Sequence, residues 1–236
     1  MLELRNISLI KDNKVILNNI NIVFNNDKFV VITGPNGSGK SSLVKIIMGI
    51  EKPSSGKVIL DGKDITNMSI DERANIGISF AFQNPVKFKG ITVYDLLKLS
   101  LNKDVCKREC CDTLSEVGLC IKDYVDREVN GTLSGGELKR IEIATVMARN
   151  PKIAIFDEPE AGIDLWSFQR LTSVFNALRK QSKGITIVIS HQEKILDIAD
   201  EVVLLQNGII EKIGNKEEII NSIFVDKTCC LGDNNE

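Results

Sequence analysis

Residues 34–41 carry the residue types that bind phosphate groups. They follow the pattern G-x-x-x-x-G-K-[ST] and stand between an apolar run and a helical stretch. Glycines let the backbone wrap closely around an anion, so that N–H groups and a helix N-terminus point at phosphates. Lys40 adds a full charge, and the Ser41 hydroxyl suits Mg²⁺. We predict that MgATP binds to Gly34, Pro35, Asn36, Gly37, Ser38, Gly39, Lys40, Ser41 and Ser42.

Two adjacent acids follow a second apolar run. Ile153–Phe156 is typical of a buried strand, and Asp157 and Glu158 come directly after it. Ligands of parallel sheets bind at the carboxyl ends of the strands, where these two side chains would lie. Asp157 is suited to hold Mg²⁺, mostly through water, and Glu158 to polarise the attacking water. The pair therefore predicts ATP hydrolysis with Glu158 as the base.

The elements that position these residues are predicted from hydrophobic pattern and turn signals. Alternation indicates half-buried strands, apolar runs indicate buried strands, and Asp-Gly and Asn-Gly indicate tight turns. We predict strands at 2–9, 15–24, 28–33, 57–60, 77–82, 153–156, 185–190, 202–205 and 209–213, and helices at 40–48, after Ser69, at 165–181 and at 192–199. Strands that alternate with helices imply an α/β fold with a mainly parallel sheet.

From about residue 85 to 150, helical periodicity replaces the strand pattern. Ser134-Gly135-Gly136-Glu137 is a capping box and a second glycine-rich helix start, hence another anion-binding end. We predict one domain over 1–236. Its parts are a nucleotide-binding α/β core with a β subdomain (1–84 and 151–225), an inserted helical subdomain (85–150) and a loosely ordered tail (226–236).

With these motifs in order, nearly the whole chain resembles the ABC ATPase family. The resemblance implies a P-loop NTPase fold with a RecA-like core, an antiparallel β subdomain and an inserted α-helical subdomain. Further motifs are the Q-loop glutamine Gln83, the LSGGQ-type signature Leu133–Glu137, the D-loop Ala161–Asp164 and the switch histidine His191. The resemblance implies that Gln83 contacts Mg²⁺ and the attacking water, and that His191 contacts the γ-phosphate.

The resemblance also implies an ATP-dependent homodimer. Two copies would pack head to tail, with each ATP between Lys40 of one copy and the signature residues Ser134, Gly135, Gly136 and Glu137 of the other. Asp164 would contact the opposite copy.

Within the family, residues 81–86 and 157–168 look like the SufC-type ATPase of the Suf iron–sulfur cluster assembly system. The family places an adenine-stacking aromatic near Lys11, and residues 9–14 contain none, which fits that subfamily and leaves adenine selectivity open. The implied partner is a SufB- or SufD-type scaffold, docked on exposed Val86, Phe88 and Ile91. The alternative is the nucleotide-binding subunit of an ABC membrane transporter, in which the same lobe contacts a permease.

Other function classes fit the chain less well. The net charge is −2 and no long coiled-coil insertion is present, which argues against a DNA-repair head and a nucleic-acid partner. Intact Glu158 and His191 argue against a non-catalytic scaffold. No apolar run approaches the roughly 20 residues that span a bilayer, so we expect a cytoplasmic protein without direct membrane insertion.

The chain has six cysteines, none in C-x-x-C spacing. We expect reduced thiols, with a metal or cluster site as the open alternative, at Cys106, Cys110, Cys111, Cys120, Cys229 and Cys230.

Overall fold

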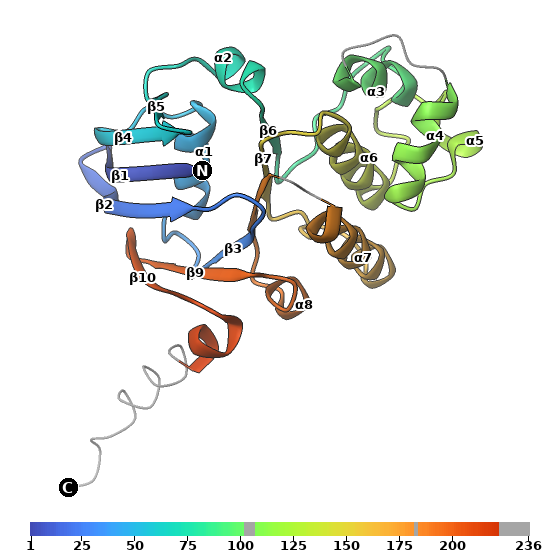
Figure 1. Cartoon of the computed structure of the whole chain (residues 1–236). Coiled ribbons are helices and arrows are strands. Elements are labelled where there is room, and N and C mark those ends of the chain that lie inside the picture. Colours follow the sequence, from blue (N-terminus) through green and yellow to red (C-terminus); the bar gives the residue numbers. More distant parts are fainter. Residues whose placement is uncertain (102–106, 182–183, 222–236) are drawn as a thin grey trace, which may run out of the picture.

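Two β-sheets form the frame of the molecule in the computed structural model, which describes residues 1–101, 107–181 and 184–221 (Figure 1). An antiparallel sheet has the strand order β2-β1-β4-β5, and a six-stranded sheet has the order β10-β9-β3-β8-β7-β6. The strands are β1 (Leu2–Lys11), β2 (Lys14–Phe24), β3 (Phe29–Thr33), β4 (Ser55–Leu60), β5 (Lys63–Asp64), β6 (Ile78–Ala81), β7 (Ile153–Asp157), β8 (Ile185–Ile189), β9 (Glu201–Gln206) and β10 (Ile209–Gly214).

The six-stranded sheet is parallel except at its β10 edge. Helices connect and cover the strands, namely α1 (Lys40–Met48), α2 (Ile70–Asn75), α3 (Val93–Leu101), α4 (Lys107–Glu116), α5 (Ile121–Tyr124), α6 (Gly135–Ala148), α7 (Leu165–Gln181) and α8 (Glu193–Leu196). This arrangement confirms the predicted α/β fold.

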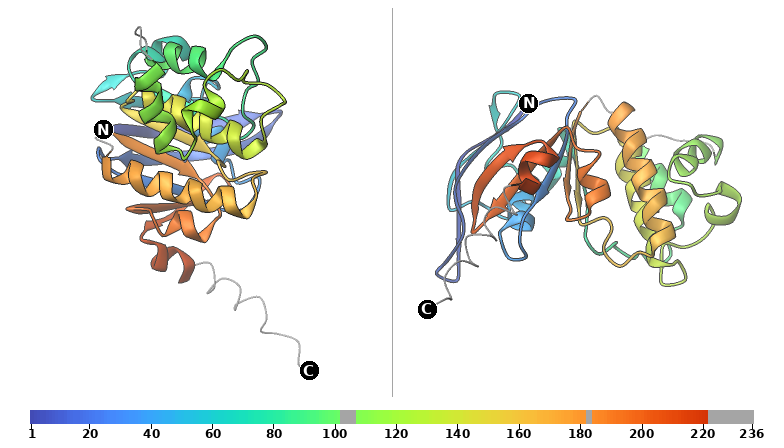
Figure 2. Two further views of the ribbon diagram at one scale, coloured as in Figure 1. Left: turned by 90° about the vertical axis from the view of Figure 1, so that its right-hand side faces the viewer. Right: turned by 90° about the horizontal axis from the view of Figure 1, so that it is seen from below.

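Two apolar cores lie on opposite faces of the parallel sheet. Val30 and Ile32 of β3 belong to the core that contains α1 and the antiparallel sheet. Phe29 and Val31, which alternate with them, belong to the core that contains α6 and α7. Figure 2 shows the same order of layers, with the antiparallel sheet and the helices α6 and α7 on opposite sides of the six-stranded sheet.

Most predicted elements are confirmed within a few residues. The Asn207-Gly208 turn joins β9 to β10 with φ of 50° and 75°, as a tight hairpin requires. Helix α8 is shorter than the predicted 192–199. After Leu196 the chain makes a tighter turn, in which the Ile198 N–H donates to the Ile195 carbonyl and the Ala199 N–H donates to the Leu196 carbonyl. This tighter turn brings Asp200 to the start of β3, where its carboxylate accepts the Phe29 N–H.

A buried arginine anchors the phosphate-loop helix α1 at its far end. Arg73, which is 1% exposed, donates through Nη1 to the carbonyls of Ile46 and Ile47 at 2.6 and 2.7 Å. These carbonyls lie in the last turn of the helix, where the Ile46 carbonyl also accepts the Gly49 N–H at 3.1 Å, and the guanidinium adds a donor to both. Gly49 closes the same end in a left-handed conformation, with φ of 79°. The C-terminal end of α1 is therefore anchored, which holds the helix in place relative to the phosphate loop at its N-terminus.

Some predictions fall outside the described residues, namely the tail at 226–236 and Cys106, Cys229 and Cys230. The structure places Cys110 in the helical core and leaves Cys120 exposed. Within 1–101, 107–181 and 184–221, no His, Cys, Asp and Glu side chains gather into a group that could hold a metal ion. No helix in these ranges is long and apolar enough to cross a membrane.

Candidate nucleotide-binding site

The loop between β3 and α1 has the shape of an anion cradle. Gly34 adopts φ of 142°, and a Cβ there would lie 1.9 Å from the carbonyl oxygen of Leu205, so only glycine fits. Gly39 begins α1 in a left-handed conformation with φ of 99°. The Ser38 hydroxyl is buried and has no hydrogen-bond partner in this loop. A buried hydroxyl without a partner, beside the N-terminus of α1, suits a phosphate oxygen.

Lys40 folds back into the loop. Its ammonium donates to the carbonyl oxygens of Gly34 and Pro35, at 2.7 and 2.9 Å. Burial lowers the pKa of Lys40, and the nearby carboxylates of Glu158 and Asp157 oppose that change. The ammonium thus occupies the centre of the loop. A bound phosphate group would replace the two carbonyl oxygens as its hydrogen-bond acceptor.

The acids after β7 come to the same edge of the sheet. Ser41 donates its hydroxyl to Asp157 Oδ1 at 3.3 Å, as expected for two ligands of one cation. Burial raises the pKa of Asp157, and the Ser41 hydrogen bond opposes the rise. A carboxylate and a hydroxyl are hard oxygen donors of the kind that Mg²⁺ prefers, so the residues present fit this ion.

Glu158 lies in a strained turn between two strand ends. Its φ of 45° is disfavoured for a residue with a Cβ by about 1–2 kcal/mol. Its N–H donates to the carbonyl of Ile189 at the end of β8, 3.1 Å away. Gln83 donates its side-chain amide to Glu158 Oε2 at 2.5 Å. The structure therefore brings Gln83 to the predicted base, while Ser41 pairs with Asp157.

His191 follows β8 and completes the edge. Its Nδ1 lies 3.5 Å from the Thr33 hydroxyl at the end of β3. Partial loss of solvent around the exposed His191 and then the Lys40 ammonium lower its pKa, against the attraction of Glu158, so the ring is neutral at pH 7. Residues after β3, β6, β7 and β8 thus meet at the carboxyl edge of the parallel sheet, where such folds bind ligands.

The signature residues form a second cluster, on α6. Ser134 and Glu137 make the predicted capping box. Glu137 Oε2 accepts the Ser134 N–H, and Oε1 accepts the Tyr124 hydroxyl, each at 2.7 Å. Both oxygens of Glu137 are therefore engaged within the chain. Tyr124 carries no motif signal, and sequence reasoning missed it.

The D-loop packs directly against the signature. Ser167 donates its hydroxyl to Asp164 Oδ2 at 2.8 Å, and a Cβ on Gly136 would lie 2.7 Å from that hydroxyl oxygen. Asp164 Oδ1 accepts the N–H groups of Trp166 and Ser167 and so caps α7. Because α1 and α6 cover opposite faces of the sheet, this cluster and the phosphate loop are separate features of one chain.

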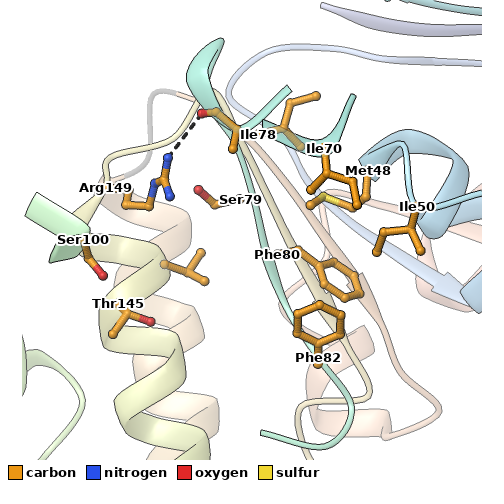
Figure 3. Close-up of a pocket in the computed structure, with 12 residues that line it drawn as sticks. Met48, Ile50, Ile70, Ile78, Ser79, Phe80, Phe82, Ser100, Thr145 and Arg149 are labelled. Carbon is orange, nitrogen blue, oxygen red and sulfur yellow. Dashed lines mark hydrogen bonds between the residues drawn. The ribbon is translucent and has the colours of Figure 1, made fainter. Parts of the chain in front are cut away.

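An apolar groove of about 480 Å³ opens beside the site. Figure 3 shows Met48, Ile50 and Ile70 on one side of the groove and Ser100, Thr145 and Arg149 on the other, with the Phe80 and Phe82 rings between them. These two rings are T-shaped, with centroids 4.7 Å apart. Phe82 is 43% exposed and directly precedes Gln83. The groove is thus lined by Phe82, the neighbour of Gln83, and Gln83 contacts Glu158.

Helix α6 holds the backbone of Phe82 by the side chains of Lys139 and Glu142. Glu142 Oε1 accepts the Phe82 N–H at 2.8 Å, and Lys139 Nζ donates to the Phe82 carbonyl at 2.5 Å. Lys139 is buried, and its ammonium lies 3.9 Å from Glu142 Oε2. Sequence reasoning missed both. The available signal was a Lys and a Glu three residues apart among apolar positions of a predicted helix.

Glu142→Gln is expected to flatten the dependence of stability on pH. Burial raises the pKa of Glu142 from 4.5 to about 7, although Phe82 and Lys139 oppose the rise. The native state therefore holds a proton that the unfolded state releases, and the stability this gives at low pH is lost as pH rises through about 7. The loss is about 3 kcal/mol, and the variant should lack it. Urea unfolding between about pH 4 and pH 8 measures the slope.

The exposed Glu217 provides the control, because Glu217→Gln should keep the wild-type slope. If Glu142→Gln and the wild type lose stability equally over this pH range, the proposed titration is wrong.

One prediction about the docking surface is wrong in part. Val86 is 47% exposed, as expected. Phe88 instead packs against the helical core, and its N–H donates to the Val129 carbonyl. Ile91 is half-buried, and its carbonyl accepts the Val129 N–H. Backbone pairing with residue 129 turns this segment inward, so the exposed apolar surface lies at Phe82, Ile50 and Ile70 instead.

The parallel sheet, the glycine-rich loop before α1 and the acids at the end of β7 define a P-loop NTPase. A family profile described as ABC transporter matches residues 17–161. The chain belongs to this family, and it is an ATP-hydrolysing ABC cassette.

Two proteins of similar sequence are both named as ATP-binding proteins. An uncharacterized ABC transporter ATP-binding protein, MJ0035 of Methanocaldococcus jannaschii, is 37% identical, with 97% of this chain and 94% of that protein covered. The spermidine/putrescine import ATP-binding protein PotA of Mesoplasma florum is 35% identical over 94% of this chain. The chain spans 63% of the length of that PotA.

Solved structures show the same fold. The ATP-binding cassette MJ0796, in a dimeric post-hydrolysis state bound to ADP and Pi, superposes with a TM-score of 0.81 at 25% identity, covering 91% of this chain and 98% of that one. A nucleotide-free ATP-binding cassette from an ABC transporter gives 0.80 at 30% identity, covering 100% and 99%.

Proposed function

We propose that the chain is the nucleotide-binding subunit of an ABC membrane transporter, held by a permease on the cytoplasmic face of the membrane. The apolar groove beside Gln83 is the observation that carries this proposal. Its rim exposes Phe82, Ile50 and Ile70, and grooves of this kind take the apolar face of a partner helix. The names of the relatives, which mention transport, support the same conclusion.

In this proposal the triphosphate lies along residues 34–42. Lys40 leaves the carbonyls of Gly34 and Pro35 for the phosphates, and Ser38 donates its unpartnered hydroxyl. Ser41, Asp157 and Gln83 would hold Mg²⁺, which supplies charge neutralisation for the transferred phosphoryl group. Glu158 accepts a proton from the attacking water, and neutral His191 donates a hydrogen bond to the γ-phosphate.

A second copy completes the site. The helix N-terminus at Ser134, Gly135, Gly136 and Glu137 presents N–H groups to the phosphates bound by the other copy. Asp164 braces this helix start through Ser167, so the signature and the D-loop act as one surface. We retain residues 85–150 as the helical subdomain that carries this surface, and residues 1–84 and 151–225 as the core.

Affinity purification of the tagged chain from membranes of the native cells tests the permease. Mass spectrometry should identify a polytopic membrane protein, and Phe82→Asp should abolish its recovery because a carboxylate enters an apolar groove. Ile213→Asp is the matched control, since Ile213 is an exposed apolar residue on β10, outside the groove. Equal recovery with Phe82→Asp would contradict docking in the groove.

A second candidate is the SufC-type subunit that drives iron–sulfur cluster assembly on a SufB- or SufD-type scaffold. The resemblance of residues 157–168 and the absence of an aromatic in residues 9–14 favour it. The nucleotide chemistry would be unchanged and the scaffold would take the groove. The same purification separates the two candidates, because a SufB-like protein without membrane spans would replace the permease.

A further inference from the structure

Glu160 places a carboxyl group behind the turn that carries Glu158. The Ser190 hydroxyl donates to Glu160 Oε1 at 2.5 Å. The other oxygen, Oε2, is buried and has no hydrogen-bond partner. Burial raises the pKa of Glu160, while the Ser190 hydroxyl and the His191 backbone N–H oppose the rise. A buried carboxyl oxygen without a hydrogen-bond partner destabilises the fold, and proteins concentrate such groups at functional sites.

Ser190 connects this carboxyl to the predicted switch residue. Ser190 is fully buried and directly precedes His191. Its hydroxyl oxygen accepts the Gln192 N–H at 3.0 Å, and its own N–H donates to the Ile32 carbonyl at 3.2 Å. The backbone on both sides of His191 is therefore tied, through one hydroxyl, to Glu160. His191 itself is exposed, and among the residues that the structure describes its imidazole has one hydrogen-bond approach, to the Thr33 hydroxyl at 3.5 Å.

Glu160 is also tied to the catalytic turn. The Ala161 N–H donates to the Glu158 carbonyl at 3.0 Å, which closes a tight turn around Pro159 and Glu160. The Glu158 N–H donates to Ile189, one residue before Ser190. The left-handed backbone of Glu158 persists only where its surroundings hold it. One carboxyl group thus joins the turn of Glu158 to the loop of His191.

We propose that Glu160 is a positioning residue, which locks the His191 loop to the Glu158 turn so that base and imidazole face the same γ-phosphate. This inference rests on the proposed function. Replacing the carboxyl would leave the phosphate loop intact but let His191 drift from its place. Catalytic groups must be held to within about 1 Å, and a displacement of that size can cost about a hundredfold in rate.

A double-mutant cycle with His191→Ala tests the role. Glu160→Ala should lower kcat for ATP hydrolysis by about tenfold or more, with KM within about twofold because the phosphate loop is untouched. In the His191→Ala background, Glu160→Ala should lower kcat no further, because its effect passes through the imidazole. Glu160→Gln, which keeps an acceptor for Ser190, should retain more of kcat than Glu160→Ala.

The cycle distinguishes positioning from a general structural role. Equal fractional losses of kcat in the two backgrounds, or a raised KM with unchanged kcat, would overturn the inference. Thermal unfolding of each variant is compared, and if Glu160→Ala does not fold, the cycle is run with Glu160→Gln. A wild-type chain that releases no phosphate would overturn the proposed function as well, whereas additive losses in an active wild type would overturn only the role of Glu160.

Discussion

Glu158→Gln is expected to abolish turnover and to accumulate an ATP-bound dimer. The amide cannot accept the proton of the attacking water, so phosphate release should fall by at least about a hundredfold. The substitution preserves shape, and the Gln83 amide can still donate to the remaining oxygen at this position. It also removes a negative charge that faces the γ-phosphate. ATP should therefore stay bound between two copies, and sizing chromatography with MgATP should detect the dimer.

Glu217→Gln provides a matched control, because the same chemical change is made at an exposed glutamate on another element. That variant should hydrolyse ATP at the wild-type rate and form no lasting dimer. Phosphate release by Glu158→Gln at the parental rate, or an elution volume unaffected by MgATP, would count against the role assigned to Glu158.

Lys40→Ala is expected to weaken ATP binding by about ten- to a hundredfold, since a hydrogen bond from a charged group contributes about 1.5–3 kcal/mol. The ammonium is buried in the loop on two carbonyl oxygens, and it needs only to leave these for the phosphates when ATP binds. The variant keeps the glycines and the α1 N-terminus, so residual binding should remain. Titration calorimetry with MgATP measures the dissociation constants.

Lys63→Ala removes a lysine of the same charge from exposed strand β5, and its affinity should equal that of the wild type. Should Lys40→Ala bind MgATP as tightly as Lys63→Ala, the phosphates would have to lie elsewhere.

The fold was accessible from the sequence because local and global signals agree. The buried runs that form β3, β7 and β8 contain continuous apolar residues, as parallel strands covered on both faces require. The Asn207-Gly208 turn and the Ser69 and Ser134 capping boxes mark element ends by local chemistry. No such signal marks the two-residue strand β5 or the early end of α8. Contacts with residues distant in sequence determine both features.

The candidate site was accessible only where a motif marks the residue. Gln83 and His191 were placed by resemblance, and the structure adds the contacts with Glu158 and Thr33. Glu160 and Tyr124 were not recognised as contact residues, and Lys139 and Glu142 were missed altogether. Their contacts join residues between 13 and 60 positions apart in sequence, and no local pattern encodes such pairs.

Mixing two inactive variants tests the shared site most directly. With ATP well below the raised dissociation constant of Lys40→Ala, this substitution leaves the phosphate loop of one chain empty, and Ser134→Arg blocks the signature of the other. In a head-to-tail dimer of the two, one site combines an intact loop with an intact signature. The mixture should therefore release phosphate at a rate that neither variant reaches alone. A mixture that remains as inactive as its components, or a Ser134→Arg chain with wild-type activity, would contradict the account.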